Sequence, residues 1–335
     1  MKKQVLVAMG FSVFALANAG AQGLTSPACP SGTQSERVAQ DACQQAYDIY
    51  QFLAPQLGVI LAGGNATLGQ GSTLGGLGHF SIGLRANAAQ GAYPEVDKYT
   101  QSTAGAQRGN LQTKDQLLPL PTADAAIGIL GGVPLGVTNV FAVDLLVSAA
   151  YVPTFTSNTV TLTPSQNLQI GYGAKVGILQ ESIVVPGVAV TYLKRDLPTT
   201  SITATSGSNA FTISNLDVKT TAWRVVASKS LLLFGVVVGG GQDTYDQSAN
   251  ISATVNNIVG IPGVTSGTST IPGTSQSRTR TNYFADVSLN LPLFKLVGEV
   301  GQSSGGDAIN TYNSFVGGRA DRTLSYFSLG LRLGL

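Results

Sequence analysis

The sequence TLSYFSLGLRLGL, at residues 323–335, decides the fold class of this chain. Its residues alternate between two kinds with a period of two, the spacing at which side chains of a β-strand point to opposite faces. One face would carry Ser325, Phe327, Leu329, Leu331, Leu333 and Leu335, and the other Leu324, Tyr326, Ser328, Gly330, Arg332 and Gly334. The pattern predicts a strand with one hydrocarbon face. Taken alone, it would also fit a strand of a soluble sandwich.

The same stretch resembles the closing strand of Gram-negative outer-membrane β-barrels, in which apolar residues alternate up to the last position. Phe327, Leu329, Leu331 and Leu333 match that pattern. Those barrels usually end in an aromatic residue, whereas this chain ends in Leu335. The resemblance implies a bacterial outer-membrane location, contact with outer-membrane lipid, and recognition of this strand by the barrel-assembly machinery.

Residues 1–21 have the organisation of a secretory signal peptide. Two lysines precede an apolar stretch at 5–16, and small residues follow it. The apolar stretch is too short for a membrane helix, and we expect cleavage near Ala19 or Ala21. The sequence therefore predicts an exported protein.

The composition narrows the class of exported protein. Only 11% of residues are charged, and 41 are glycine. Loss of the leader would remove two of the 19 basic residues and none of the 17 acidic ones, leaving a net charge of about zero. Nucleic acid is not expected as a partner, because phosphate binding needs a surplus of Lys and Arg. No later stretch is apolar over the roughly 18 residues of a membrane helix, which leaves a secreted β-protein or a membrane barrel.

A helix is predicted after the leader. Thr33 and Glu36 have the spacing of a capping box. Pro55 is expected to kink or end the helix. One apolar stripe at helical spacing follows the cap, formed by Val38, Ala42, Ala46, Ile49, Leu53 and Leu57.

Cys29 and Cys43 are the only two cysteines. In an exported protein the default is a disulfide between them, which would pin the lead-in segment to the helix. A reactive thiol pair is less expected, because the two cysteines lack a CxxC spacing. The helix could lie inside a barrel as a plug or against its periplasmic rim.

A glycine-rich segment, residues 58–78, follows the helix. Its glycines fit neither a dinucleotide-binding loop nor a P-loop, and we interpret it as a flexible linker. Residues 22–78 are thus interpreted as a periplasmic helical segment with a connector, and 79–335 as the barrel.

Alternation with a period of two recurs from residue 79 to the end. The fold class predicted is all-β, an antiparallel transmembrane β-barrel of about ten strands, within a range of roughly 8 to 14, with an N-terminal amphipathic helix. Most candidates are about ten residues long, as a tilted membrane strand requires. The candidate strands are 79–87, 124–130, 141–151, 168–178, 184–193, 220–228, 232–242, 282–291, 294–302 and 323–335.

The connections between these strands alternate in length, as in outer-membrane barrels with periplasmic turns and external loops. A secreted sandwich has no reason to alternate in this way. The short connections are 131–138, 179–185, 229–231 and 290–293, and the long ones are 91–122, 153–167, 195–210, 245–277 and 303–321.

Eight charged residues are expected to line the lumen. They could form a charged pore lining, or a buried ion network that fills a narrow barrel. The eight residues are Arg85, Asp144, Lys175, Arg224, Asp286, Lys295, Glu299 and Arg332.

Catalytic chemistry has little support in this sequence. His79 is the only histidine, and no Ser or Asp partner is indicated for it. One histidine and two cysteines cannot form a His/Cys metal cluster. We therefore expect neither an enzyme nor a bound cofactor or metal.

Two functions remain open. The first is passive or facilitated transport of a small or hydrophobic solute, with the helix as plug; the predicted architecture is similar to that of long-chain fatty-acid transporters, although their Asn-Pro-Ala motif is absent. The second is a structural or adhesive surface barrel with a filled lumen. The sequence does not indicate a solute.

Overall fold

The computed structural model describes residues 24–306, 309–319 and 321–334. The predicted leader, residues 1–21, lies outside the described residues, as does Leu335.

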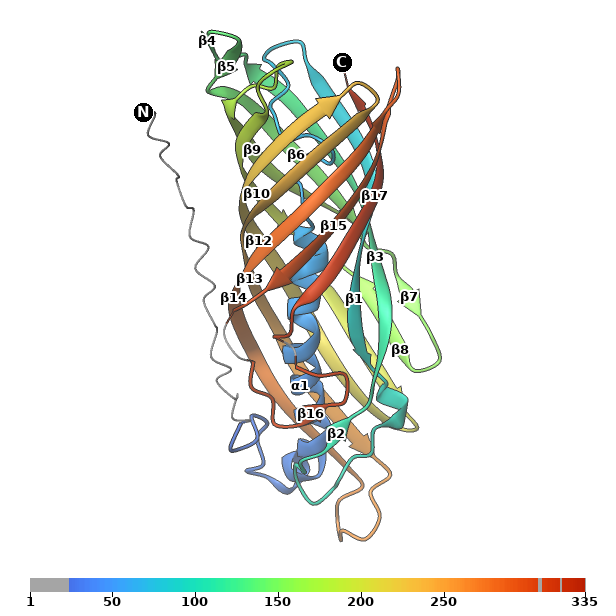
Figure 1. The fold of residues 1–335 in the computed structure, drawn as a ribbon. Coiled ribbons are helices and arrows are strands. Elements are labelled where there is room, and N and C mark those ends of the chain that lie inside the picture. The colour runs from blue at the N-terminus through green and yellow to red at the C-terminus, as the bar shows by residue number, and fades with distance from the viewer. Residues whose placement is uncertain (1–23, 307–308, 320, 335) are drawn as a thin grey trace, which may run out of the picture.

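Ten long strands surround one long helix (Figure 1). The helix is α1 (Gln34–Ala62), and a short 3-10 helix, η1, spans Val96–Lys98. The long strands are β1 (Phe80–Pro94), β3 (Thr113–Leu130), β6 (Ala142–Tyr151), β9 (Leu168–Leu179), β10 (Gly187–Asp196), β12 (Asn209–Leu231), β13 (Phe234–Asn256), β14 (Ser266–Asn290), β15 (Lys295–Ser304) and β17 (Leu324–Gly334). The remaining strands are β2 (Asn110–Leu111), β4 (Val133–Leu135), β5 (Thr138–Val140), β7 (Phe155–Thr156), β8 (Val160–Pro164), β11 (Thr200–Ser206) and β16 (Ser314–Phe315).

The long strands form an antiparallel ring in the order β10-β9-β6-β3-β1-β17-β15-β14-β13-β12. The pairing of β12 with β10 closes this ring. β1 and β17, the first and last ring strands in the sequence, are neighbours in the ring, with Leu84 opposite Leu331. Closure leaves no free edge in the ring, which is the condition for a sheet that crosses a membrane. The predicted antiparallel barrel of about ten strands is confirmed.

The predicted alternation has a physical counterpart in the outward side chains. In β17, Leu329, Leu331 and Leu333 are 59%, 50% and 54% exposed, whereas Arg332 is 7% exposed. A continuous exposed apolar surface of this kind is typical of a lipid-facing barrel wall. We call it the outer apolar belt, and it includes Ile82, Leu84, Ile127, Leu145, Val147, Tyr172, Tyr192, Trp223, Val225, Val236, Val238, Tyr283, Val287, Val300, Leu329, Leu331 and Leu333.

Four strands are much longer than predicted: β3, which has 18 residues where 124–130 was predicted, and β12, β13 and β14. β12 and β13 have 23 residues each and β14 has 25, about twice what a membrane crossing needs. Part of the predicted loop 91–122 and much of the predicted loops 195–210 and 245–277 are therefore strand. These extensions persist because their inner faces are covered: Ile251, Ala253 and Val255 are buried in the core cluster that includes the helix.

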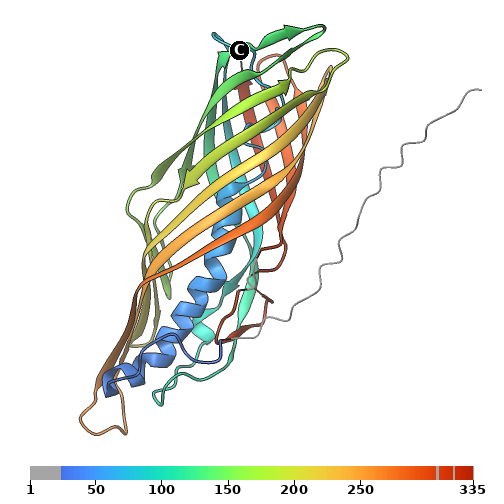
Figure 2. The same ribbon diagram turned by 90° about the vertical axis from the view of Figure 1, so that its left-hand side faces the viewer.

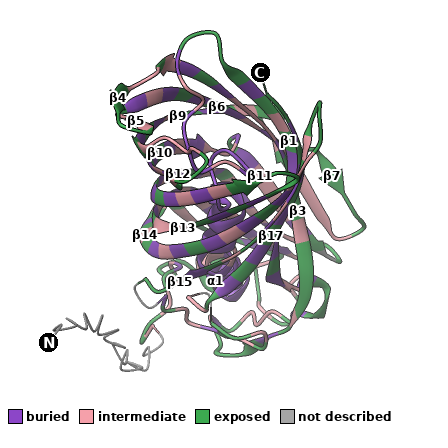
Figure 3. Ribbon diagram, turned by 45° about the horizontal axis from the view of Figure 1, so that its top comes forward, coloured by how far each residue is buried: buried purple, intermediate pink, exposed green. Residues whose placement is uncertain are grey.

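Helix α1 lies inside the ring, where it packs mainly against β12, β13 and β14 (Figure 2). Figure 3 shows it buried within the strands. The N-terminus of α1 lies at the end of the barrel that carries the long loops. The segment after α1 runs toward the opposite end, which carries the short turns (Figure 1). Of the two placements that the sequence left open for this helix, a plug in the lumen or contact with the periplasmic rim, the structure has the plug.

The helix does not end at Pro55, although an end there was one of the two outcomes expected. It continues to Ala62, although proline lacks the amide hydrogen for one helical bond. The turns after Pro55 are held by burial, since Val59, Ile60 and Leu61 are at most 2% exposed. At the other end, the predicted capping box of Thr33 and Glu36 is present.

Candidate functional site in the lumen

All eight predicted lumen residues lie on inward faces of the ring strands. Seven are buried, and Lys295 is half-buried. They do not line an open pore. Helix α1 and the segment that follows it occupy the space between them. From here on, the connector means residues 63–76, a part of the predicted linker 58–78 that follows the helix.

The connector is not the flexible linker that its glycines predicted. Residues 63–69 are all buried, and lumen carboxylates bind their backbone amides. Asp286 accepts hydrogen bonds from the amide of Gly69 at 2.8 Å and from Asn65 Nδ2 at 2.7 Å. Glu299 accepts one from the amide of Asn65. Further along the connector, both carboxylate oxygens of Asp144 accept from the amide of Leu74, at 3.1 and 3.0 Å.

Two predicted cations bind carbonyl oxygens of the same segment. Arg85 Nη1 donates to the carbonyl of Asn65 at 2.7 Å, and Lys175 Nζ donates to that of Gln70 at 3.1 Å. Because charge-assisted hydrogen bonds are stronger than neutral ones, these contacts fix the path of the connector through the lumen.

Glycine allows this close approach. A Cβ added at Gly64 would lie 2.3 Å from a carboxylate oxygen of Glu299. Gly69 has φ +71, a conformation that favours glycine, and a Cβ there would lie 2.7 Å from Val297. The glycines of the connector therefore serve close packing.

The C-terminus of α1 meets two arginines. Arg195 Nη1 donates to the carbonyl of Ala62 at 2.9 Å, and Arg224 reaches the same oxygen at 3.4 Å. Cations are favourable at this end of a helix because its last carbonyls carry partial negative charge.

Three lumen residues were missed by sequence reasoning. Asp124 forms ion pairs of 2.8 Å with both Arg85 and Arg195, and Asp243 pairs with Arg224 at 2.7 Å. The signal for them was weak. Asp124 stands at the start of a weakly alternating segment, and Arg195 and Asp243 fall just beyond the predicted strand ends.

Arg332 and Lys295 differ from the other predicted residues. Neither makes an ion pair or a side-chain hydrogen bond within the described part of the chain. Both line a cavity of about 390 Å³ between the connector and the short turns. A second cavity, beside the connector and the β1–β17 seam, has a volume of only about 10 Å³.

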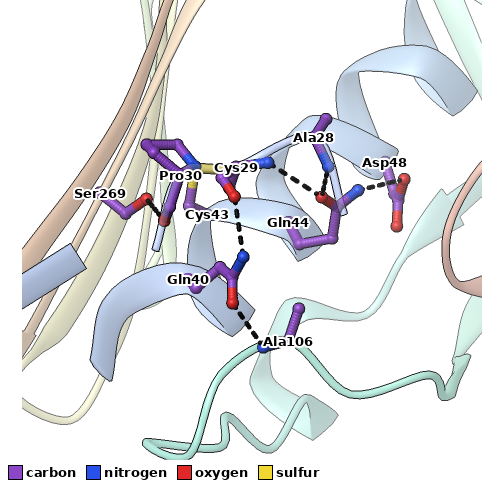
Figure 4. Close-up of a disulfide and its surroundings, with 9 residues drawn as sticks. All are labelled: Ala28, Cys29, Pro30, Gln40, Cys43, Gln44, Asp48, Ala106 and Ser269. Carbon is purple, nitrogen blue, oxygen red and sulfur yellow. Dashed lines mark hydrogen bonds between the residues drawn. A yellow bond between two sulfur atoms is a disulfide. The ribbon is translucent and has the colours of Figure 1, made fainter. Parts of the chain in front are cut away.

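At the long-loop end, the structure contains the Cys29–Cys43 disulfide. Gln40 Nε2 donates to the carbonyl of Cys29 at 2.8 Å, and Gln44 Oε1 accepts from the amide of Ala28 at 2.6 Å (Figure 4). The disulfide and these glutamines join the lead-in segment to the first turns of α1.

Two aspartates of α1 bind backbone amides of the long loops. Asp41 accepts from the amide of Ser102 at 2.7 Å. Asp48 accepts from the amides of Tyr312 and Asn313 at 3.0 and 2.9 Å. Burial raises the pKa of Asp48 to about 6, against the opposing effect of these hydrogen bonds.

Two further features bear on chemistry, the histidine and the possible metal ligands. His79 is exposed, and its Nδ1 lies 3.3 Å from the carbonyl oxygen of Gly76. No group of three His, Cys, Asp or Glu residues that could hold a metal occurs among the described residues. Within the same residues, no helix is both long and apolar enough to cross a membrane.

Comparison with solved structures yields outer-membrane proteins at low identity. The attachment invasion locus protein Ail of Yersinia pestis is 12% identical, with 77% of this chain and 99% of that chain covered and a TM-score of 0.22. The transport unit of the autotransporter AIDA-I from Escherichia coli is 8% identical, with 87% and 98% covered and a TM-score of 0.35. The Pseudomonas putida toluene transporter TodX is 8% identical, with 76% and 88% covered and a TM-score of 0.22. No protein-family model and no curated protein matches the sequence.

These likenesses are too weak to carry an argument by themselves. The class of protein follows from the closed antiparallel ring and the outer apolar belt. The chain is an outer-membrane β-barrel of ten strands with a helix inside it.

Proposed function

We propose that this protein is a closed outer-membrane barrel with a resident plug, and that it acts as a structural or adhesive surface protein through its long-loop end. The observation that carries the proposal is the filled lumen. Helix α1 and the connector occupy it, and buried charges bind the connector along its length.

The way the connector is held supports a permanent plug. Withdrawing it would leave Asp286 and Glu299, both at most 1% exposed, without the donors on Asn65 and Gly69. An unpaired buried carboxylate is costly. The filled state is therefore the favourable one.

The long-loop end supports the surface role. In the proposed orientation, long loops face outward and short turns face the periplasm. The outward end then contains the hairpin of β13 and β14, the disulfide, and the loops that Asp41 and Asp48 hold onto α1. These contacts give the exposed loops a defined shape, which recognition of a partner surface requires.

Transport of a small or hydrophobic solute is the second candidate. The cavity of about 390 Å³ that reaches the connector from the short-turn end favours it. In that case the connector would move to open a path.

Conductance of purified protein in a planar bilayer tests the proposal. We expect no steady current from the wild type. In Gly64→Leu the added side chain would overlap Glu299, so the connector should be displaced and current should appear. Gly298→Ala is the control, because a Cβ there meets nothing within 4 Å. Steady current through the wild type would overturn the closed barrel and favour transport.

A further inference from the structure

The geometry points to a binding site for a small phosphate-type oxyanion in the cavity at the short-turn end of the lumen. The site consists of Arg332 on β17 and Lys295 on β15, with polar groups of the connector and the neighbouring turns around them. It does not depend on the proposed surface function, because it lies at the opposite end of the barrel.

Arg332 is the main observation. Its side chain is 7% exposed and lines the cavity. Its Nε and Nη1 atoms are buried without a hydrogen-bond partner among the described residues. Buried polar groups are normally hydrogen-bonded, and a buried guanidinium without an acceptor is costly. A ligand with acceptor oxygens would supply what the protein does not.

The position of Lys295 is a second observation in favour of an anion site. It lies directly opposite Arg332 in the β15–β17 pairing. Like charges at opposite positions of neighbouring strands repel. An anion between the two side chains would convert this repulsion into two attractive contacts.

The acids nearby attract the two cations at longer range, Asp144 acting on Arg332 and Glu181 on Lys295, but do not contact them. Glu181 lines the same cavity, but its carboxylate accepts from Ser228 Oγ at 2.7 Å and from the amide of Ser230 at 2.5 Å. Asp144 accepts from the amide of Leu74. Neither acid forms an ion pair with Arg332 or Lys295 within the described residues.

The chemistry of the lining selects the class of ligand. An arginine fork and a lysine ammonium together suit a tetrahedral oxyanion. Around them lie the polar side chains of Gln70, Ser72 and Ser182, which can bind the remaining oxygens or attached hydroxyls. A cavity of about 390 Å³ has room for a phosphate with a small polar substituent. Of the residues that line the cavity, only Val236 belongs to the outer apolar belt, so we assign the ligand as a free solute and not a lipid headgroup.

Calorimetric titration of the folded full chain with inorganic phosphate tests the site. The wild type should bind one phosphate per chain saturably, and Arg332→Gln and Lys295→Gln should each weaken binding about tenfold. Lys219→Gln is the control for loss of one positive charge, because Lys219 pairs with Asp217 away from the cavity. If Arg332→Gln does not fold, the Lys295→Gln variant still tests the site, because Lys295 is only half-buried and its replacement should leave folding intact.

Three results would overturn the proposal: no saturable binding to the wild type, unchanged binding in Lys295→Gln, or an equal loss in Lys219→Gln. Titrations in phosphatidylcholine and phosphatidylglycerol vesicles, at a high ionic strength that screens the surface charge of the anionic vesicles, separate a free ligand from a lipid headgroup. We expect the same affinity in both. Weaker phosphate binding in the anionic vesicles would assign the site to a lipid headgroup and contradict a free ligand.

Discussion

At the scale of single residues, the predicted lumen charges other than Arg332 and Lys295 each have a partner. Arg224 is 1% exposed and pairs with Asp243, which also accepts a hydrogen bond from Asn282 Nδ2 at 2.7 Å. Such a pair adds little stability compared with an apolar pair of similar size, but removing one partner leaves a buried charge.

Arg224→Met should therefore lower the free energy of unfolding by about 3 to 5 kcal/mol. The double variant Arg224→Met/Asp243→Leu should recover much of that loss, because no charge is then stranded. Reversible folding into lipid vesicles measures both. Equal losses in the single and double variants would contradict the assigned pairing.

Asp48 gives a prediction about pH. It lies at the level of the long loops, since Tyr50, two residues on, donates to the carbonyl of Gln247, beyond the outer apolar belt. Burial raises its pKa from 3.8 to about 6. The folded state then binds the proton more tightly than the unfolded state. The Asp48 contribution to stability is fully present below pH 3.8 and is lost as pH rises through about 6, by about 3 kcal/mol in all.

Asp48→Asn tests this sign. The free energy of unfolding of the wild type minus that of the variant should fall between pH 4 and pH 7. Denaturant unfolding at the two pH values gives the difference, and amide hydrogen exchange at Tyr312 and Asn313 reports the loop itself. A difference that does not change with pH, or that rises, would show that the carboxylate is not desolvated as the structure has it.

At the scale of elements, the outward faces of the strands could be predicted and their ends could not. A period of two identifies which residues of β17 point outward. It cannot show where pairing stops, because that depends on what covers the other face. β12 to β14 continue past the membrane since α1 lies against them. Tertiary contacts also decide the two other cases. Burial keeps Pro55 inside the helix, and the glycines of the connector fit close contacts that exist only in the folded state.

Leu331→Arg tests the lipid-facing side of β17. Leu331 is 50% exposed within the outer apolar belt, so a charge there should cost about 2 to 4 kcal/mol near the middle of the bilayer. Thr254→Arg, on the outward side of the β13 extension, is the control and should cost little. Folding into vesicles, with heat-dependent gel mobility as the sign of a closed barrel, gives the comparison. A Leu331→Arg variant as stable as the parent would contradict contact with lipid.

At the scale of the whole molecule, the eight predicted lumen residues are on one inner surface, yet their roles could not be predicted. Six of them bind the connector or another buried charge, while Arg332 and Lys295 face a cavity. The sequence shows which face is polar. It does not show that a segment from before the first strand fills the interior. Cleavage of the leader and recognition of β17 by the assembly machinery stay predictions.

A cross-link inside the lumen tests the filled barrel most directly. A Cβ added at Gly177 on β9 would lie 3.6 Å from Thr73 Cβ in the connector, within the range for a disulfide. Oxidised Thr73→Cys/Gly177→Cys should form this bond almost completely in the folded protein, without change in folding or conductance, while each single variant should keep one free thiol. Two reactive thiols in the folded double variant would show that the connector does not lie in the lumen, and would contradict the account.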